Sequence, residues 1–90
     1  MAKQFQLQII TQEKTVFDEP VTSVTLPGEE GYFGVLADHA PLVATLGRGN
    51  LVVKQGENHV REFVIDGGFM EVLDNVAMVL VDSLTDPSAA

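Results

Sequence analysis

Alternation of apolar and polar residues is the feature that most constrains what this chain can fold into. In QFQLQII, residues 4–10, the side chains of Phe5, Leu7 and Ile9 fall on one side of an extended chain, and the glutamines between them fall on the other. A period of two is typical of a β-strand with one face on a core and one face in water. The N-terminal segment is therefore expected to form a half-buried strand.

Turn signals divide the rest of the chain into further short strands. Residues 21–26 are rich in β-branched residues and stop at Pro27-Gly28, a turn signal. Gly56-Glu57-Asn58 separates two apolar segments and predicts a hairpin. Asp74-Asn75 also separates two such segments, and both residues tolerate the positive φ of a tight two-residue turn. Gly67-Gly68 is expected to let the chain turn or bulge between two strands.

Short strands with turn signals about every 8–12 residues predict an all-β fold, either a sandwich or a flattened barrel. The one helix candidate is a single turn at Ala40-Pro41, capped by Asp38, because proline is tolerated at the first helical position. Residues 76–81, VAMVLV, are apolar on both faces. Such a strand is expected either between two layers or with one face covered by a partner. We expect a single domain over residues 1–86 and a short tail over 87–90.

Length and composition exclude several classes of protein. The 90 residues are enough for one domain but not for two. The chain has no cysteine, which excludes a disulfide framework and a thiolate metal site. Its net charge of −8 repels nucleic acid and favours either a basic protein partner or simply solubility. The apolar segments are far shorter than the roughly 20 residues that cross a bilayer, and the N-terminus lacks the continuous apolar run of a signal peptide.

No arrangement of residues predicts catalysis or metal binding. Asp38 and His39 are adjacent, whereas the partners of a catalytic triad are normally distant in sequence, and none of the serines lies in a nucleophile elbow. His39 and His59 lack a metal-binding spacing. The segments GEEGYFG and DGGF do not combine a lysine with a following helix, as a phosphate-binding loop requires. We therefore expect no catalytic residue, no metal and no cofactor.

Two questions stay open at the level of the sequence. Several apolar residues gather in one loop-rich region, and they suit a core and an interface anchor equally well. The arginine of GRGN is either solvated or bound to a partner carboxylate. The apolar residues are Tyr32, Phe33, Leu36, Leu42 and Leu46, and the arginine is Arg48.

The segment GYFGVLADHAPLVATL, residues 31–46, resembles the signature of the epsilon subunit of F-type ATP synthases, which is called delta in mitochondria. The shared pattern is Gly-x-x-Gly, an aliphatic pair, a short turn and His-Ala-Pro-Leu. Residues 20–31 and 63–83 are similar to two further segments of this family. The likeness extends over residues 3–85, and its motifs are specific in combination.

The resemblance implies a ten-stranded β-sandwich that is not itself an enzyme. It implies a rotor subunit of the central stalk, which binds the gamma subunit and the c-ring and couples proton-driven rotation to ATP synthesis in the catalytic head. Such a subunit is peripheral to an energy-transducing membrane, on the cytoplasmic face in bacteria, with the thylakoid as an alternative. The strands and the negative charge are equally compatible with a generic acidic β-sandwich module that binds another basic protein.

Two groups of residues match contact positions of this family. The resemblance assigns the first group to a loop that faces the c-ring, where acidic side chains complement basic loops. It assigns the second group to the neighbourhood of the gamma contact. The first group is Glu29, Glu30, Gly31 and Tyr32, and the second is Thr11, His39, Pro41, Leu42 and Ala44.

Three features differ from the usual pattern of the family. Tyr32 stands where relatives often have an acidic residue, and Ala37-Asp38 replaces a more usual Pro-Gly. Most relatives also carry a second domain, a helical hairpin that inhibits ATP hydrolysis and in some cases binds ATP. The chain ends at SLTDPSAA, so these inhibitory and nucleotide-binding roles are not expected for it, whether it is a naturally short member or a truncated form.

Overall fold

A computed structural model of the chain describes residues 3–87, and all regular structure within them is β-strand. The predicted all-β class is confirmed, and the chain runs as a loop at Ala40-Pro41, the one helix candidate of the sequence. Residues 88–90 of the predicted tail lie outside the described part. The strands are β1 (Phe5–Ile10), β2 (Thr15–Val21), β3 (Ser23–Gly28), β4 (Gly31–Leu36), β5 (Leu42–Lys54), β6 (Val60–Leu73), β7 (Val76–Val81) and β8 (Leu84–Thr85).

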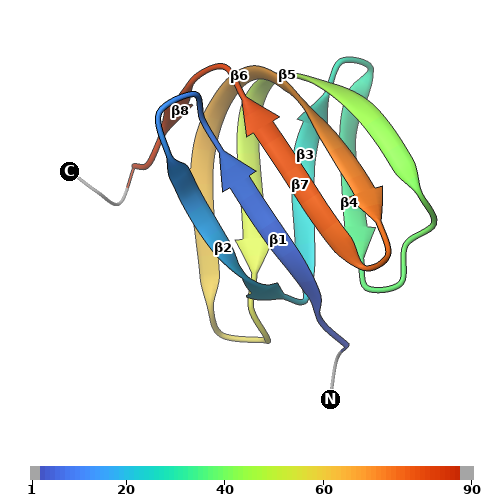
Figure 1. The fold of residues 1–90 in the computed structure, drawn as a ribbon. Coiled ribbons are helices and arrows are strands. Elements are labelled where there is room, and N and C mark those ends of the chain that lie inside the picture. The colour runs from blue at the N-terminus through green and yellow to red at the C-terminus, as the bar shows by residue number, and fades with distance from the viewer. Residues whose placement is uncertain (1–2, 88–90) are drawn as a thin grey trace.

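The strands form one sheet that folds over on itself into two facing layers (Figure 1). The order is β2-β1-β7-β6-β5-β3-β4, and β8 pairs with β6. The long strands β5 and β6 belong to both layers. The C-terminal half of β6 pairs with β7, whereas its N-terminal half pairs with β8. β5 pairs with β6 along one edge, and along its other edge it pairs with β3 at Leu46 and over residues 52–54.

The strand count differs from the ten strands that the resemblance implies. The described residues form eight, because β5 and β6 each continue through the bend that joins the layers. Their antiparallel register is unbroken from the pair Leu42↔Val72 to the pair Lys54↔Val60. Gly67-Gly68 therefore bends β6 within one strand and does not separate two strands, which corrects the prediction from the sequence. Both glycines have positive φ, 83° and 140°, so the bend depends on glycine.

Two of the predicted turns lie at the expected residues, and a third lies two residues later than expected. Asp74 and Asn75 have φ of 50° and 63°, which confirms a two-residue turn with positive φ at both positions between β6 and β7. Gly56, with φ of 83°, lies in the predicted hairpin between β5 and β6. Pro27-Gly28 remains inside β3, and the turn lies at Glu29-Glu30. The pairing of β3 with β5 shifts register beside Pro27, since proline offers no N–H to a ladder.

The core lies between the layers and is apolar throughout. No polar or charged residue in the described part of the chain is buried, and every strand from β1 to β7 contributes buried side chains. Only one face of β7 is buried, and Ala77, Val79 and Val81 form it. On the other face Val76 remains 39% exposed. The alternative that places β7 between two layers is therefore wrong. The expectation that a partner covers its outer face remains a prediction.

Candidate functional site

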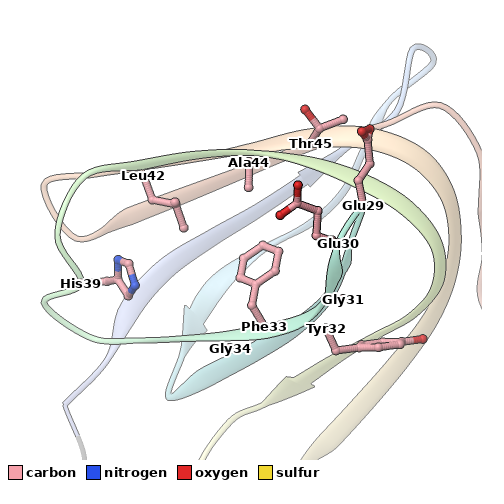
Figure 2. A pocket seen from close by; sticks show the side chains of 11 residues that line it. Glu29, Glu30, Gly31, Tyr32, Phe33, Gly34, His39, Leu42, Ala44 and Thr45 are labelled. Atoms are coloured by element: carbon pink, nitrogen blue, oxygen red, sulfur yellow. The ribbon is translucent and has the colours of Figure 1, made fainter.

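The sandwich is open along one side, between β4 and the N-terminal half of β5. β4 ends the strand order and pairs with β3 only, so no strand in residues 3–87 fills the space beside it. A groove of about 620 Å³ runs there (Figure 2). Its lining consists of Gly28, Glu29, Glu30, Gly31, Tyr32, Phe33, Gly34, His39, Leu42, Ala44 and Thr45.

This groove brings together residues from both groups that the sequence singled out. It contains the whole group assigned to the c-ring loop. It also contains His39, Leu42 and Ala44 from the group assigned to gamma. Pro41 lies in the loop just before β5 but does not line the groove. Two sets of residues that were separate predictions thus form one continuous surface, with Thr11 elsewhere.

Thr11 lies in the turn between β1 and β2 and lines a different hollow, together with Arg61 and Asp86. Its N–H donates to the carbonyl of Lys14 at 2.9 Å, and its hydroxyl accepts from the N–H groups of Glu13 and Lys14. In these bonds the threonine hydroxyl binds backbone N–H groups two and three residues further on, as in an ST-turn. Thr11 therefore has a structural role of its own, and its part in partner contact stays a prediction.

The groove has an apolar floor and an acidic rim. Phe33 and Leu42 are half-buried and pack against the core, while Glu29 and Glu30 are exposed at one end. Figure 2 shows the Phe33 ring turned into the space under Leu42 and Ala44. The open question about the loop-rich region is answered residue by residue. Leu46 belongs to the core, Phe33 and Leu42 form the floor, and Tyr32 and Leu36 are exposed by 60% and 65%.

Tyr32 borders the groove, but its ring points away from Phe33 (Figure 2). Its hydroxyl oxygen accepts a hydrogen bond from the N–H of Asn50 at 3.0 Å. The ring fits because position 49 is glycine, since a Cβ there would collide with the Tyr32 hydroxyl and lie 2.8 Å from Pro27 Cβ. The residue that differs from the family pattern thus joins β4 to β5 over the outer face of β3.

The loop that carries His39 is held in place by polar contacts to the turn after β6. The N–H of Asp38 donates to Oδ1 of Asn75 at 2.8 Å, and Nδ2 of Asn75 donates to the Gln4 carbonyl at 2.9 Å. Asp38 tolerates a φ of 63°, and its carboxylate pairs with Lys3 at 2.9 Å. The hydrogen bond to Asp38 and its negative charge raise the pKa of the Lys3 ammonium above 10.5.

His39 itself makes a local contact. Its Nδ1 lies 2.7 Å from the carbonyl oxygen of Ala40. Because a carbonyl oxygen only accepts hydrogen bonds, this contact requires a proton on Nδ1. The imidazole is exposed at the mouth of the groove.

Replacing Asn75 by glycine tests whether this contact pair fixes the loop. Glycine keeps the positive φ without strain but removes both hydrogen bonds of the side chain. We expect the free energy of unfolding to fall by about 1–2 kcal/mol. Asp74→Gly is the matched control in the same turn, with an expected change below about 0.5 kcal/mol. Urea denaturation of both variants measures the difference, and equal losses would contradict the assigned role of Asn75.

A second surface was not singled out residue by residue from the sequence. The outer face of β5, β6 and β7 exposes large apolar side chains, which we call the outer stripe. Leu73 pairs directly with Val76, and Phe69 and Leu73 lie diagonally from Val43 on the adjacent strand. The sequence contains an indication of this surface, since residues 76–81 are apolar on both faces. The stripe consists of Val43, Phe69, Leu73 and Val76, exposed by 71%, 42%, 51% and 39%.

Arg48 donates to the carboxylate of Asp66 at 3.0 Å across the bend, so its partner is within the chain. Within residues 3–87 no group of histidines and carboxylates is arranged to hold a metal ion. The same part of the chain contains no helix long and apolar enough to cross a membrane.

Fold and groove together define a β-sandwich domain whose open side has an apolar floor and an acidic rim. Residues 4–87 match the family described as "ATP synthase, Delta/Epsilon chain, beta-sandwich domain". The chain belongs to this family, which confirms the resemblance drawn from residues 31–46.

Curated relatives agree with the family assignment. The chain is 43% identical over 81 residues to the ATP synthase epsilon chain of Leptospira borgpetersenii serovar Hardjo-bovis, covering 90% of this chain and 63% of that protein. It is 47% identical over 83 residues to the ATP synthase epsilon chain of Desulfatibacillum aliphaticivorans, covering 92% of this chain and 59% of that protein. The chain therefore spans about three fifths of the length of these relatives.

Solved structures share the fold. A chain in the cryo-EM structure of the Euglena gracilis mitochondrial ATP synthase, described as OSCP/F1/c-ring, superposes with a TM-score of 0.88 at 30% identity. The match covers 97% of this chain and 56% of that one. A chain in the central stalk and c-ring structure of the Tetrahymena thermophila mitochondrial ATP synthase has a TM-score of 0.79 at 18% identity, which supports the fold alone.

Proposed function

We propose that this chain is a non-catalytic subunit of the central stalk of an F-type ATP synthase. In this role it binds the gamma subunit and the c-ring, rotates with them, and helps transmit proton-driven rotation to the catalytic head. It works at the F1 side of an energy-transducing membrane without entering it, on the cytoplasmic face in a bacterium. Membership of the epsilon family favours this role over an unrelated acidic binding module.

The observation that carries the proposal is the groove that brings the first predicted contact group together with His39, Leu42 and Ala44 of the second. The acidic end, at Glu29 and Glu30, is assigned to basic loops of the c-ring, because opposite charges favour that encounter. The end near His39, Leu42 and Ala44 is assigned to gamma, together with Pro41 in the adjoining loop. Tyr32 contributes through the exposed part of its ring, while its hydroxyl oxygen accepts the hydrogen bond from the N–H of Asn50. Thr11 contributes from its separate position.

Reconstitution is the direct test of this function. The chain is mixed with purified gamma and the catalytic head, and then with membranes that hold the c-ring, and incorporation is scored by co-sedimentation. Stoichiometric incorporation, with no ATPase activity in the isolated chain, is the expected result. Failure to bind gamma at both low and physiological salt would remove the proposal. Recovery of partners unrelated to ATP synthase would favour the generic acidic module.

Charge reversal at Glu30 separates binding from stability. Glu30 is exposed at the rim, so Glu30→Lys is expected to change the free energy of unfolding by less than about 0.5 kcal/mol. Incorporation with the c-ring is expected to weaken by about 5–10-fold at low salt, and by less at high salt. Glu57→Lys makes the same charge change in the exposed turn between β5 and β6, away from the groove. Equal weakening by both variants would show that only net charge matters.

A further inference from the structure

The two edges of this sheet are protected to very different degrees. β2 and β4 are the ends of the strand order. An exposed edge strand invites pairing with another chain, and proteins normally prevent this with charges, proline, bulges or coverage. β2 has all of these features. It carries Asp18, Glu19 and Pro20, its pairing with β1 shifts register, and Gln55 covers it by donating to Glu19 and to the Pro20 carbonyl at 3.0 Å each.

β4 has none of these protections. Its sequence is GYFGVL, without a charge or a proline, and its register against β3 is regular throughout. Within the described residues no other segment pairs with its outer edge. Tyr32 and Leu36 remain largely exposed on its outer face, and Phe33 lines the groove on its inner face. The sheet is thus protected at its β2 edge and open at its β4 edge, and an open edge is suited to strand addition by a partner.

The register shows which backbone groups of β4 are free. Gly28 and Gly31 flank the two-residue turn and pair with each other. In such a hairpin the flanking pair exchanges hydrogen bonds, and bonded and non-bonded pairs alternate along the strands. Tyr32, Gly34 and Leu36 therefore direct their N–H and carbonyl groups outward. Pro27 lies opposite Tyr32 and has no N–H to offer, which agrees with this assignment.

We propose that the outer edge of β4 is a strand-addition site for an extended segment of a basic protein partner. The segment pairs with the backbone of Tyr32, Gly34 and Leu36 and lays alternate apolar side chains on the groove floor. Glu29 and Glu30 precede β4 and form the acidic rim, and their charges attract a basic segment toward this edge. The net charge of −8 favours the same partner. This inference rests on the proposed function only in naming gamma as the partner.

Amide exchange distinguishes strand addition from any other mode of binding. The ¹⁵N-labelled chain is measured alone, with purified gamma, and with the capped peptide Lys-Val-Thr-Val-Thr-Val. Exchange at Tyr32, Gly34 and Leu36 is expected to slow by about tenfold or more in the complex. Phe33 and Val35 already bond to β3, so their exchange should change by less than about twofold.

Each outcome bears on a different proposal. Protection by the peptide without binding of gamma would support strand addition and remove gamma as the partner. Binding of gamma without the alternating protection would overturn strand addition and leave the proposed function standing. Absence of protection with both ligands would also overturn it. Protection that appears in the chain alone as its concentration rises would identify a second copy as the occupant, and would overturn the proposed partner.

Substitution at Gly34 removes one outward N–H without removing a bond to β3. Gly34→Pro is expected to weaken the binding of gamma by about tenfold or more. Gly34→Ala is the matched control, because a Cβ there lies 3.8 Å from the nearest atom and the N–H is kept. Its binding should stay within about twofold of the unaltered chain. Binding of Gly34→Pro at full strength would overturn the inference.

A side-chain variant covers the case in which Gly34→Pro does not fold. Leu36→Lys places a charge on the outer face of the edge, the device that proteins use against strand pairing. It is expected to weaken the binding of gamma by about tenfold, whereas Leu36→Thr stays within about threefold. Equal binding by these two variants, with unchanged thermal midpoints, would count against strand addition.

Discussion

Val79→Asp is expected to leave the chain largely unfolded at neutral pH. Val79 is fully buried in β7, where it lies opposite Ile9 of β1 and Met70 of β6. A carboxylate at that position would be surrounded by apolar side chains, since the described core contains no polar partner. An unpaired buried charge lowers the free energy of unfolding by about 4–5 kcal/mol or more. That loss reaches the lower end of the stability of about 5–13 kcal/mol that a domain of this size has.

Val76→Asp is the matched control for this prediction. It makes the same chemical change in the same strand, but Val76 is 39% exposed and lies at the end of the strand. Its expected loss is below about 1 kcal/mol. Far-ultraviolet circular dichroism and thermal unfolding measure both variants. A thermal midpoint for Val79→Asp close to that of the unaltered chain would show that the assigned face of β7 is wrong.

The fold class could be predicted from the sequence because strand alternation and turn chemistry are local properties. QFQLQII places Phe5 and Leu7 on the core side, and both are buried. Asp74-Asn75 adopts the positive φ that a two-residue turn requires. The strand count and the layers depend on non-local contacts, however. Nothing in DGGF states that the chain bends without breaking its register, because that outcome depends on β5 following the same bend.

The site was only partly predictable for the same reason. The segment 29–44 marked most of the groove through its resemblance to a family, yet the spacing of residues in the chain does not show that Glu29 and His39 line one space. β3 ends opposite Leu46 of β5, and β4 pairs only with β3. Residues 42–45 of β5 therefore have no strand beside them on that side, and the groove lies there. The partner of Arg48 was equally hidden, since Asp66 is brought opposite it by the register of β5 and β6.

The proposed strand addition accounts for the unequal protection of the two sheet edges. Charges and a proline on β2 prevent pairing there, while β4 presents an uncharged edge beside an acidic rim. A charge within β4 would protect the free protein against self-association, but it would also oppose a partner strand. Net negative charge reduces self-association by repulsion between copies and still attracts a basic partner.

Gly68→Ala is expected to lower the free energy of unfolding by about 3–4 kcal/mol, because it combines backbone strain with a collision. Gly68 has a φ of 140°, and its Cα faces the backbone of β7 at the bend. An added Cβ would collide with the carbonyl oxygen of Leu80 and lie 2.9 Å from the Cα of Val81. These are backbone atoms of a paired strand, so they cannot rotate away as a side chain would. β6 must then straighten, which separates the two layers that its bend joins.

Gly31→Ala separates the two contributions. Gly31 has nearly the same φ, 135°, but a Cβ there would meet no atom within 4 Å. Its loss should contain only the conformational part, about 1–2 kcal/mol. Urea denaturation of the two variants gives the difference, which we expect to be about 2 kcal/mol. Equal losses would mean that β7 relaxes around the new methyl group, and that the bend in β6 depends on the conformational freedom of glycine alone.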